Sequence, residues 1–157
     1  HRRPAEADAE FETAIELAGV ALPQVPIAAK VASAEGHRHS ATARSIQAAR
    51  EALAIEERAD IMPALRVLAG DLIAWSWTRT GRADDAALVL AAGDELRQRL
   101  GFSGIGWGLD IRNDAWSTAR DVLGPAEAAQ LTTRGRTLSV AEYRALLASD
   151  RVVVPSA

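Results

Sequence analysis

The sequence predicts an all-α protein made of antiparallel helical hairpins stacked side by side. Apolar residues recur at three- and four-residue spacing in successive segments, which is the period of an amphipathic helix. Alanine, which has the highest helix propensity, is abundant, and aromatic residues make up only 4% of the chain. The clearest unit is 67–101, where two amphipathic segments flank the turn Thr80-Gly81-Arg82 and Ala86 stands where the two helices would touch. Such a hairpin buries its apolar face by stacking on neighbours.

Three helices are expected before this hairpin. Pro4 fits the first turn of a helix whose early residues are acidic, which suits the positive end of the helix dipole. Two prolines in 19–26 cannot continue that helix and are predicted to end it. A second helix is predicted over 27–35 and a third over 42–57, with Ser40 as a capping residue between them.

The central hairpin consists of two long helices. Asp60 is predicted to cap a helix over 61–80, in which Pro63 is tolerated because it falls in the first turn. This helix is apolar over more than one stripe, so we expect neighbours to cover it on two sides. Its antiparallel partner is predicted over 82–100, and Gly101 is predicted to end it.

The C-terminal third is predicted to hold three short helices that cap the array. The glycine-rich segment 101–108 is expected to be a connector, and Ser139 and Glu142 form a capping-box pattern before the last helix. The short helices are predicted over 110–123, over 126–133, and after 137–139 through Ser149. We interpret the chain as a single domain of residues 1–157, with degenerate repeats in 1–58, the best-formed repeat in 59–101 and terminal capping helices in 109–150.

Composition excludes several classes of protein. A chain of 157 residues with 48% hydrophobic and 25% charged residues fits one soluble domain. Its net charge of −3 provides no basic field for nucleic acid, and the absence of cysteine excludes disulfides and thiolate metal sites. No apolar run approaches the ~18–20 residues of a membrane span. With no signal-peptide pattern either, the sequence predicts a cytoplasmic location.

Residues 67–100 resemble a tetratricopeptide repeat. Gly81 matches the glycine of the inter-helix turn, and Trp77 matches the large aromatic residue of the first helix. Gly70 departs from the pattern, which has a tryptophan there. The small and large positions of the two helices are matched by Ile73, Ala74, Ala86, Leu90 and Gly93, and the small–large–small spacing recurs at Ala7, Phe11 and Ala14.

The C-terminal half resembles the end of large bacterial regulators of the LuxR-type and related signal-transduction ATPase group, of the actinobacterial kind. Segments 87–101 and 116–147 carry the likeness, and 135–142 fits the closing phrase G-R-x-L-S-x-x-E. The resemblance covers roughly residues 60–148. It implies a tetratricopeptide-like array wound as a right-handed superhelix, in the C-terminal part of a larger transcriptional regulator. It does not imply DNA binding or ATP hydrolysis by this segment.

No set of residues suited to catalysis or to cofactor binding is recognisable. A phosphate-binding loop needs a glycine-rich turn before its lysine, and the sole lysine, Lys30, has none. His37 and His39 lie near Glu35, but zinc needs three or four converging ligands, so we expect exposed loop histidines instead. The sequence thus predicts no enzyme, no cofactor and no metal site.

The strongest candidate for a binding site is one face of the helix at 61–80. Trp75 lies about 200° round the helix from Trp77 and cannot share its face. In the resembled repeats, this side of the first helix lines a groove, and an aromatic ring beside a guanidinium can anchor a ligand. The alternative is that Trp75 packs beneath the following helices. The predicted ligand- or partner-binding residues are Asp71, Trp75, Thr78 and Arg79.

The sequence therefore predicts a non-catalytic sensor or protein-interaction domain. Its expected partner is a protein, a peptide or a small-molecule effector, with neither nucleic acid nor membrane bound by this segment. One alternative is a homodimerisation module of a signalling ATPase, in which exposed apolar helix faces would form the interface. A more distant alternative is a helical enzyme whose site is not recognisable in the sequence.

Overall fold

The protein is all-α, as the sequence predicts. The computed structural model describes residues 9, 13, 24–40, 42–59, 63–103 and 106–149, and within these ranges it contains no strand. The helix predicted to begin at Pro4 falls almost wholly outside these residues. The described helices are α2 (Gln24–His37), α3 (Thr42–Ala59), α4 (Pro63–Thr78), α5 (Ala83–Leu100), α6 (Gly106–Leu123), α7 (Pro125–Arg136) and α8 (Val140–Ala148).

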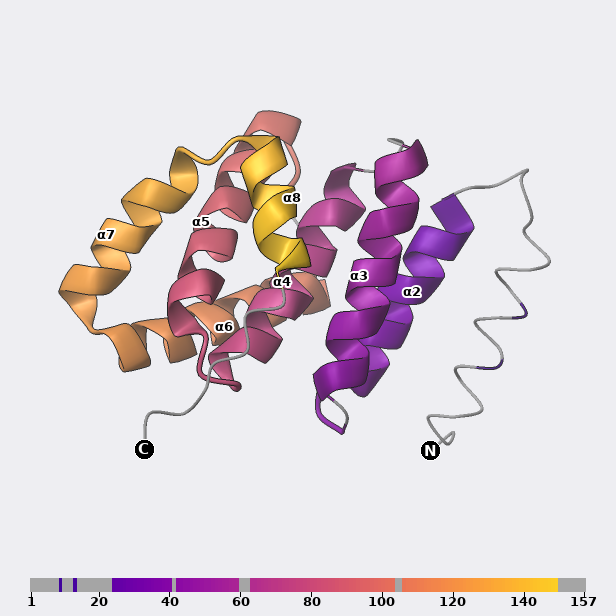
Figure 1. Cartoon of the computed structure of the whole chain (residues 1–157), viewed down its shortest axis with the longest axis horizontal. Coiled ribbons are helices and arrows are strands. Elements are labelled where there is room, and N and C mark those ends of the chain that lie inside the picture. Colours follow the sequence, from indigo (N-terminus) through magenta and orange to yellow (C-terminus); the bar gives the residue numbers. More distant parts are fainter. Residues whose placement is uncertain are drawn as a thin grey trace.

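Consecutive helices pack in pairs, and the pairs pack on one another. Helix α2 packs on α3, α4 on α5, and α6 on α7. Both α2 and α6 also contact α4, while α7 contacts α5. The α4–α5 pair therefore lies in the middle, between α2–α3 at one end and α6–α7 at the other (Figure 1).

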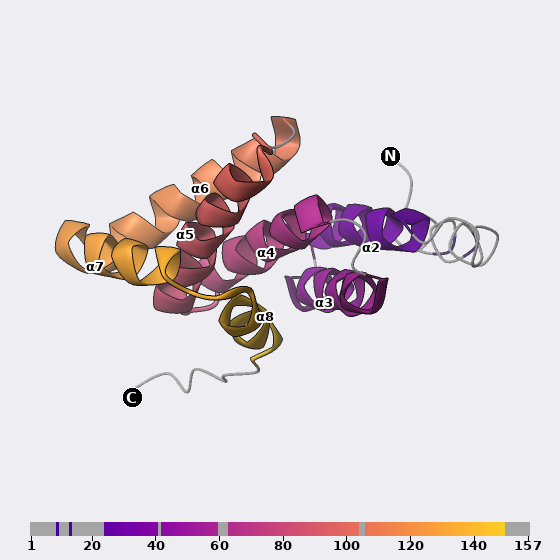
Figure 2. The same cartoon turned by 90° about the horizontal axis from the view of Figure 1, so that it is seen from above.

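Helix α8 does not extend this series. It turns back and lies, like α3, below α4 in the view of Figure 2, whereas α6 lies above α4. Its docking is long-range in sequence, because Arg50 of α3 donates a hydrogen bond to the carbonyl of Leu147, 97 residues away. The last helix thus closes back on α3, and it also contacts α5.

Helix α4 is the core of the molecule. All residues from Arg66 to Thr78 are buried. Trp75 and Trp77 point to different sides of the helix, yet only 2% and 1% of their surfaces are exposed. Both are covered because α2, α3, α5 and α6 surround α4. The prediction of a helix covered on two sides is confirmed.

The predicted turn between the central helices and the predicted end of the second one are confirmed. The predicted cap Asp60 lies outside the described residues. Gly81 has a positive φ of 79°, which a glycine adopts at little cost, and this allows the chain to reverse after α4. The amide of Arg82 then donates to the carbonyl of Trp77 at 2.9 Å, which satisfies one of the free acceptors of the helix end. Helix α5 ends at Gly101, also in the left-handed region.

Several helix boundaries differ from the sequence prediction. Helix α2 begins at Gln24, because Pro26 then falls in its first turn, where no amide hydrogen is needed. Helix α7 runs on to Arg136. Helix α6 begins at Gly106, inside the segment expected to be a connector, and its 18 residues make it as long as α5. The expectation that the last three helices are all short is therefore wrong.

The length of α6 has a packing reason. Ile111, Ala115 and Ala119 recur every four residues and are fully buried, so one continuous face of the helix is covered by α4 and α5. Burial of this face outweighs the low helix propensity of the glycines in the first turn.

The capping box before α8 is confirmed. The amide of Glu142 donates to the hydroxyl of Ser139 at 3.2 Å, and the amide of Ser139 donates to the Glu142 carboxylate at 2.8 Å. The bond from the Ser139 amide, and a second one from the Ser139 hydroxyl to the same carboxylate at 2.7 Å, lower the pKa of Glu142. None of the helices in the described part of the chain is both long and apolar enough to cross a membrane.

Candidate functional site

The predicted site residues occupy different environments. Trp75, Thr78 and Arg79 lie together at the C-terminal end of α4, whereas Asp71 pairs with a residue of α5. Asp71, Trp75 and Thr78 are buried, and only Arg79 is substantially exposed, with 33% of its side chain accessible. Trp75 is therefore a buried residue and not an open groove anchor, in line with the alternative raised by the sequence.

Trp75 is surrounded by cationic groups. The guanidinium of Arg79 lies 3.6 Å from the centroid of the Trp75 ring, and that of Arg38 lies at 5.3 Å. The ring of His39 meets the indole edge-on, at 5.2 Å between centroids. Arginine and aromatic rings attract one another at these distances. The buried indole thus forms a platform beneath basic side chains from the turn after α2 and the end of α4.

Asp114 of α6 connects this platform to a third helix. One of its carboxylate oxygens accepts a hydrogen bond from the Trp75 indole at 2.6 Å and another from Arg79 at 2.6 Å. We call Arg38, His39, Trp75, Arg79 and Asp114 the Trp75 cluster. It joins the α2–α3 turn, α4 and α6, and its polar members form a partly exposed layer over the ring.

Thr78 has a local role in this arrangement. Its hydroxyl donates to the carbonyl of Trp75 at 2.7 Å and accepts from Arg79 at 3.0 Å. Arg79 also donates to the Trp75 carbonyl at 3.2 Å. Thr78 therefore orients the Arg79 side chain rather than facing a ligand.

Asp71 belongs to a series of ion pairs that links α4, α5 and α6. It forms a buried ion pair with Arg97, which also reaches Asp94 at 3.3 Å. Asp94 in turn accepts two hydrogen bonds from Arg112, at 2.5 and 2.6 Å. Burial raises the pKa of Asp71 to about 7, although Arg97 acts in the opposite direction. The geometry indicates that Asp71 holds helices together and does not face a ligand.

Sequence reasoning missed the role of Tyr143. Its ring is buried, and a Cβ built at Gly70 would overlap its hydroxyl oxygen, while one at Gly93 would lie 3.8 Å away. The absent side chains of α4 and α5 thus form a notch that receives the tyrosine. Gly70 was the available signal, since it stands where the resembled repeat has a tryptophan. Among the described residues the Tyr143 hydroxyl has no hydrogen-bond partner, and burial raises its pKa.

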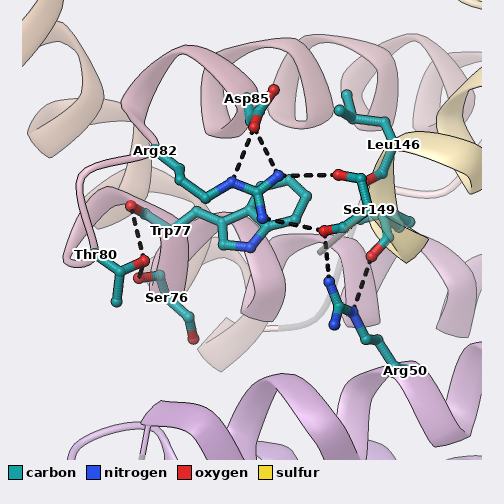
Figure 3. Close-up of polar contacts among 9 residues, drawn as sticks. Arg50, Ser76, Trp77, Thr80, Arg82, Asp85, Leu146 and Ser149 are labelled. Atoms are coloured by element: carbon teal, nitrogen blue, oxygen red, sulfur yellow. Dashed lines mark hydrogen bonds and ion pairs between the residues drawn. The ribbon is translucent and has the colours of Figure 1, made fainter. Parts of the chain in front are cut away.

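Two arginines hold the C-terminal end of α8 (Figure 3). Arg82 donates to the carbonyl of Ser149 at 3.1 Å and to its hydroxyl at 2.9 Å, and it pairs with Asp85 at 2.6 Å. Its guanidinium also lies 3.9 Å from the ring centroid of Trp77. Arg50 donates to the carbonyls of Leu147 at 3.1 Å and Ser149 at 2.8 Å. We call Arg50 and Arg82 the α8 clamp.

Clefts flank α8 on both sides. One, of about 230 Å³, separates it from α3, and another, of about 460 Å³, lies among α5, α7 and α8. Glu56 at the first cleft is buried and accepts a hydrogen bond from Arg66 at 2.7 Å, and Arg144 lies 3.7 Å from the same carboxylate. The first cleft is lined by Arg50, Leu53, Ala54, Glu56, Glu57, Arg144 and Ala148.

The prediction of exposed loop histidines is confirmed for His39 and wrong for His37. His37 is the last residue of α2, because that helix runs two residues further than predicted, and it is buried. His39 lies in the turn after α2 and is exposed, with its ring against Trp75. Within the described ranges, no three His, Cys, Asp or Glu side chains are placed so that they could hold a metal ion.

Comparison with known proteins adds no relative: no family model, curated protein or solved structure matches this chain. The features of this chain that bear on its function are therefore its helix packing and two polar arrangements, the Trp75 cluster and the α8 clamp.

Proposed function

We propose that this chain is a non-catalytic helical-repeat interaction domain of the tetratricopeptide-like type, acting as the sensor part of a larger cytoplasmic transcriptional regulator. The observation that carries the proposal is the packing of alternate helices, in which α2 and α6 both contact α4. Stacked hairpins in a right-handed superhelix have this pattern, because the first helix of each hairpin packs on the first helix of the next. Such stacks present one continuous face of alternate helices to a partner.

The Trp75 cluster crosses that face. It takes residues from the turn after α2, from the end of α4 and from α6, which are the three elements that would line the groove. A partner would meet the outer layer of the cluster rather than the buried indole. The surface therefore offers polar side chains that lie over the buried Trp75 ring.

The expected partner is an acidic segment of a protein or peptide, or an acidic small-molecule effector. Arg38 and Arg79 both lie against the same ring, and 21% and 33% of their side chains are exposed. Guanidinium groups fixed by stacking bind carboxylates with little further loss of side-chain freedom. Asp114 already supplies one carboxylate to Arg79, so an incoming acid would compete with it or add to it.

The test is a binding screen read at Trp75 itself. Short peptides that end in Asp or Glu would be compared with matched peptides that end in Asn or Gln, using the indole N–H signal of Trp75 in NMR spectra. We expect acidic peptides to shift that signal, and Arg79→Ala to abolish the shift. Arg99→Ala is the matched control, since 59% of the Arg99 side chain is exposed on α5. Binding that leaves the Trp75 signal unchanged, or that survives Arg79→Ala, contradicts this site.

Homodimerisation is the second candidate function, and one observation favours it. Two large apolar residues are exposed in the described part of the chain, Leu100 at 43% and Val122 at 65%. Val122, the more exposed of the two, lies near the end of α6. A second copy packed there would cover it. Sedimentation of the chain and of Val122→Ser at several concentrations separates the two functions, because a strictly monomeric wild type removes this candidate.

A further inference from the structure

We propose that the surface under α8 is a binding site for amphipathic helices, and that α8 is its built-in occupant, which a partner's helix replaces. We call this surface, formed by the Gly70–Gly93 notch and the α8 clamp, the α8 groove. It is built from Gly70 of α4, Gly93 of α5 and the two clamp arginines, none of which belongs to the Trp75 cluster. The inference is thus independent of the function proposed above.

Helix α8 is anchored in the groove by two side chains. Tyr143 and Leu147 are its two fully buried side chains, and their four-residue spacing puts them on one face of the helix. Ala141, Ala145 and Ala148 are exposed. Two apolar anchors one turn apart, seated in a notch of another helix pair, are typical of recognition between a groove and a separate helix.

The clamp contacts the backbone of α8. Arg50 donates to the carbonyl oxygens of Leu147 and Ser149, and Arg82 donates to the carbonyl and to the hydroxyl of Ser149. Free carbonyls occur at the C-terminal end of every α-helix, where positive charge is also favoured by the helix dipole. The clamp therefore suits any helix that ends at this point in the groove.

Helix α8 fits the groove imperfectly. The Tyr143 hydroxyl is buried with no hydrogen-bond partner among the described residues, which weakens the docking of the helix. The clefts on both sides of α8 show that its flanks are incompletely packed. A helix of nine residues is also marginal in water, so α8 depends on this contact to remain folded.

These contacts define the chemistry of the partner. Its helix would carry an aromatic residue, a basic residue directly after it, and leucine four positions after the aromatic one, near the helix C-terminus. The basic residue is expected because Arg144 lies 3.7 Å from Glu56 and 3.8 Å from Glu57 across the cleft. Phenylalanine would fit better than tyrosine, since it brings no hydroxyl into the notch.

The experiment uses the full chain and a fluorescent peptide with the sequence of residues 137–149, in which phenylalanine replaces Tyr143. Binding is measured by fluorescence anisotropy to the wild type and to the double variant Tyr143→Ala/Leu147→Ala, whose own α8 has lost its anchors. We expect binding to the double variant to be at least about tenfold tighter, because the tethered wild-type helix competes at a local concentration of roughly millimolar. A peptide with alanine at both anchor positions should not bind.

Control variants and a second measurement keep the proposal falsifiable. Ala145→Ser, on the exposed face of α8, should bind the peptide as weakly as the wild type does. If the double variant fails to fold, hydrogen exchange of the wild type decides instead. The α8 amides should then exchange about 100-fold faster than those of α4, through local opening. Equal peptide affinity for wild type and a folded double variant, no binding to that variant, or exchange of α8 only with global unfolding would each overturn the proposal.

Discussion

The hydroxyl of Tyr143 occupies the space where Gly70 would carry a side chain. A methyl group at Gly70 would overlap the hydroxyl oxygen and lie 3.0 Å from the ring carbon that bears it. The two residues are 73 positions apart, so a glycine in the middle of α4 is explained by a tyrosine in the last described helix. This pair is one of the contacts that hold α8 in place, together with Leu147 and the α8 clamp.

Substitution of Gly70 tests the pair directly. We expect Gly70→Ala to lower the free energy of unfolding by about 1–3 kcal/mol, because overpacking forces the ring or the helix to move. In a Tyr143→Ala background the same change should be neutral or stabilise by up to about 1 kcal/mol, since alanine is the better helix former. Urea unfolding of the four proteins of this double-mutant cycle measures the coupling. Equal effects of Gly70→Ala in both backgrounds would show that Tyr143 does not fill the notch.

Removing the Tyr143 hydroxyl is expected to stabilise the protein. Tyr143→Phe keeps the ring and deletes a buried polar group that has no partner in the described structure, so unfolding should cost about 1 kcal/mol more. Tyr143→Ala should instead destabilise by about 3–5 kcal/mol, because it leaves a cavity under α8. Thermal and urea unfolding give both values. A loss of stability in Tyr143→Phe would reveal a partner for the hydroxyl.

The raised pKa of Asp71 predicts a pH dependence of stability. The folded protein holds this proton up to a pKa of about 7, whereas the unfolded chain releases it near 3.8. Between these values the native state binds more protons, so the Asp71 contribution to the free energy of unfolding falls as the pH rises from 4 to 7 and levels off above 7. Asp71→Asn should flatten this part of the profile, as measured by urea unfolding at pH 5 and pH 7.5.

The pKa of Asp71, and with it the pH dependence of the free energy of unfolding, depends on neighbouring charges as well as on burial. Arg97 and Arg112 oppose the rise in its pKa, and Asp94 adds to it. Glu142 provides the contrast, because its pKa is lowered and its contribution falls only in more acidic solution. An Asp71→Asn profile parallel to that of the wild type would place the pH dependence elsewhere.

Asp114 is expected to hold Trp75 in place. Asp114→Ala removes the acceptor of both the indole N–H and Arg79, which should lower the free energy of unfolding by about 1–3 kcal/mol. It should also speed the hydrogen exchange of the Trp75 indole N–H, which NMR resolves for each tryptophan. Asp121→Ala, an exposed acid on the same helix, is the matched control. An unchanged indole exchange rate would show that the bond to Asp114 does not protect it.

Local signals in the sequence predicted the helices well. Gly81, Gly101 and the Ser139–Glu142 pair mark helix ends through their own backbone geometry and short-range hydrogen bonds, so neighbouring residues suffice to read them. The boundary of α6 was missed because burial of Ile111 by other helices outweighs the glycines at its start. Helix propensity is a weak guide where tertiary packing stabilises a segment that contains poor helix formers.

The sequence by itself determined the all-α class, the central hairpin with its turn, and the two apolar sides of α4. Only the tertiary structure decided that Trp75 is buried under Arg79, that Asp71 serves an ion pair, and that α8 returns to the α8 groove. The physical reason is the distance along the sequence over which each interaction acts. Helix period and capping act over about four residues, whereas Tyr143 and the α8 clamp meet partners that no local pattern connects to them.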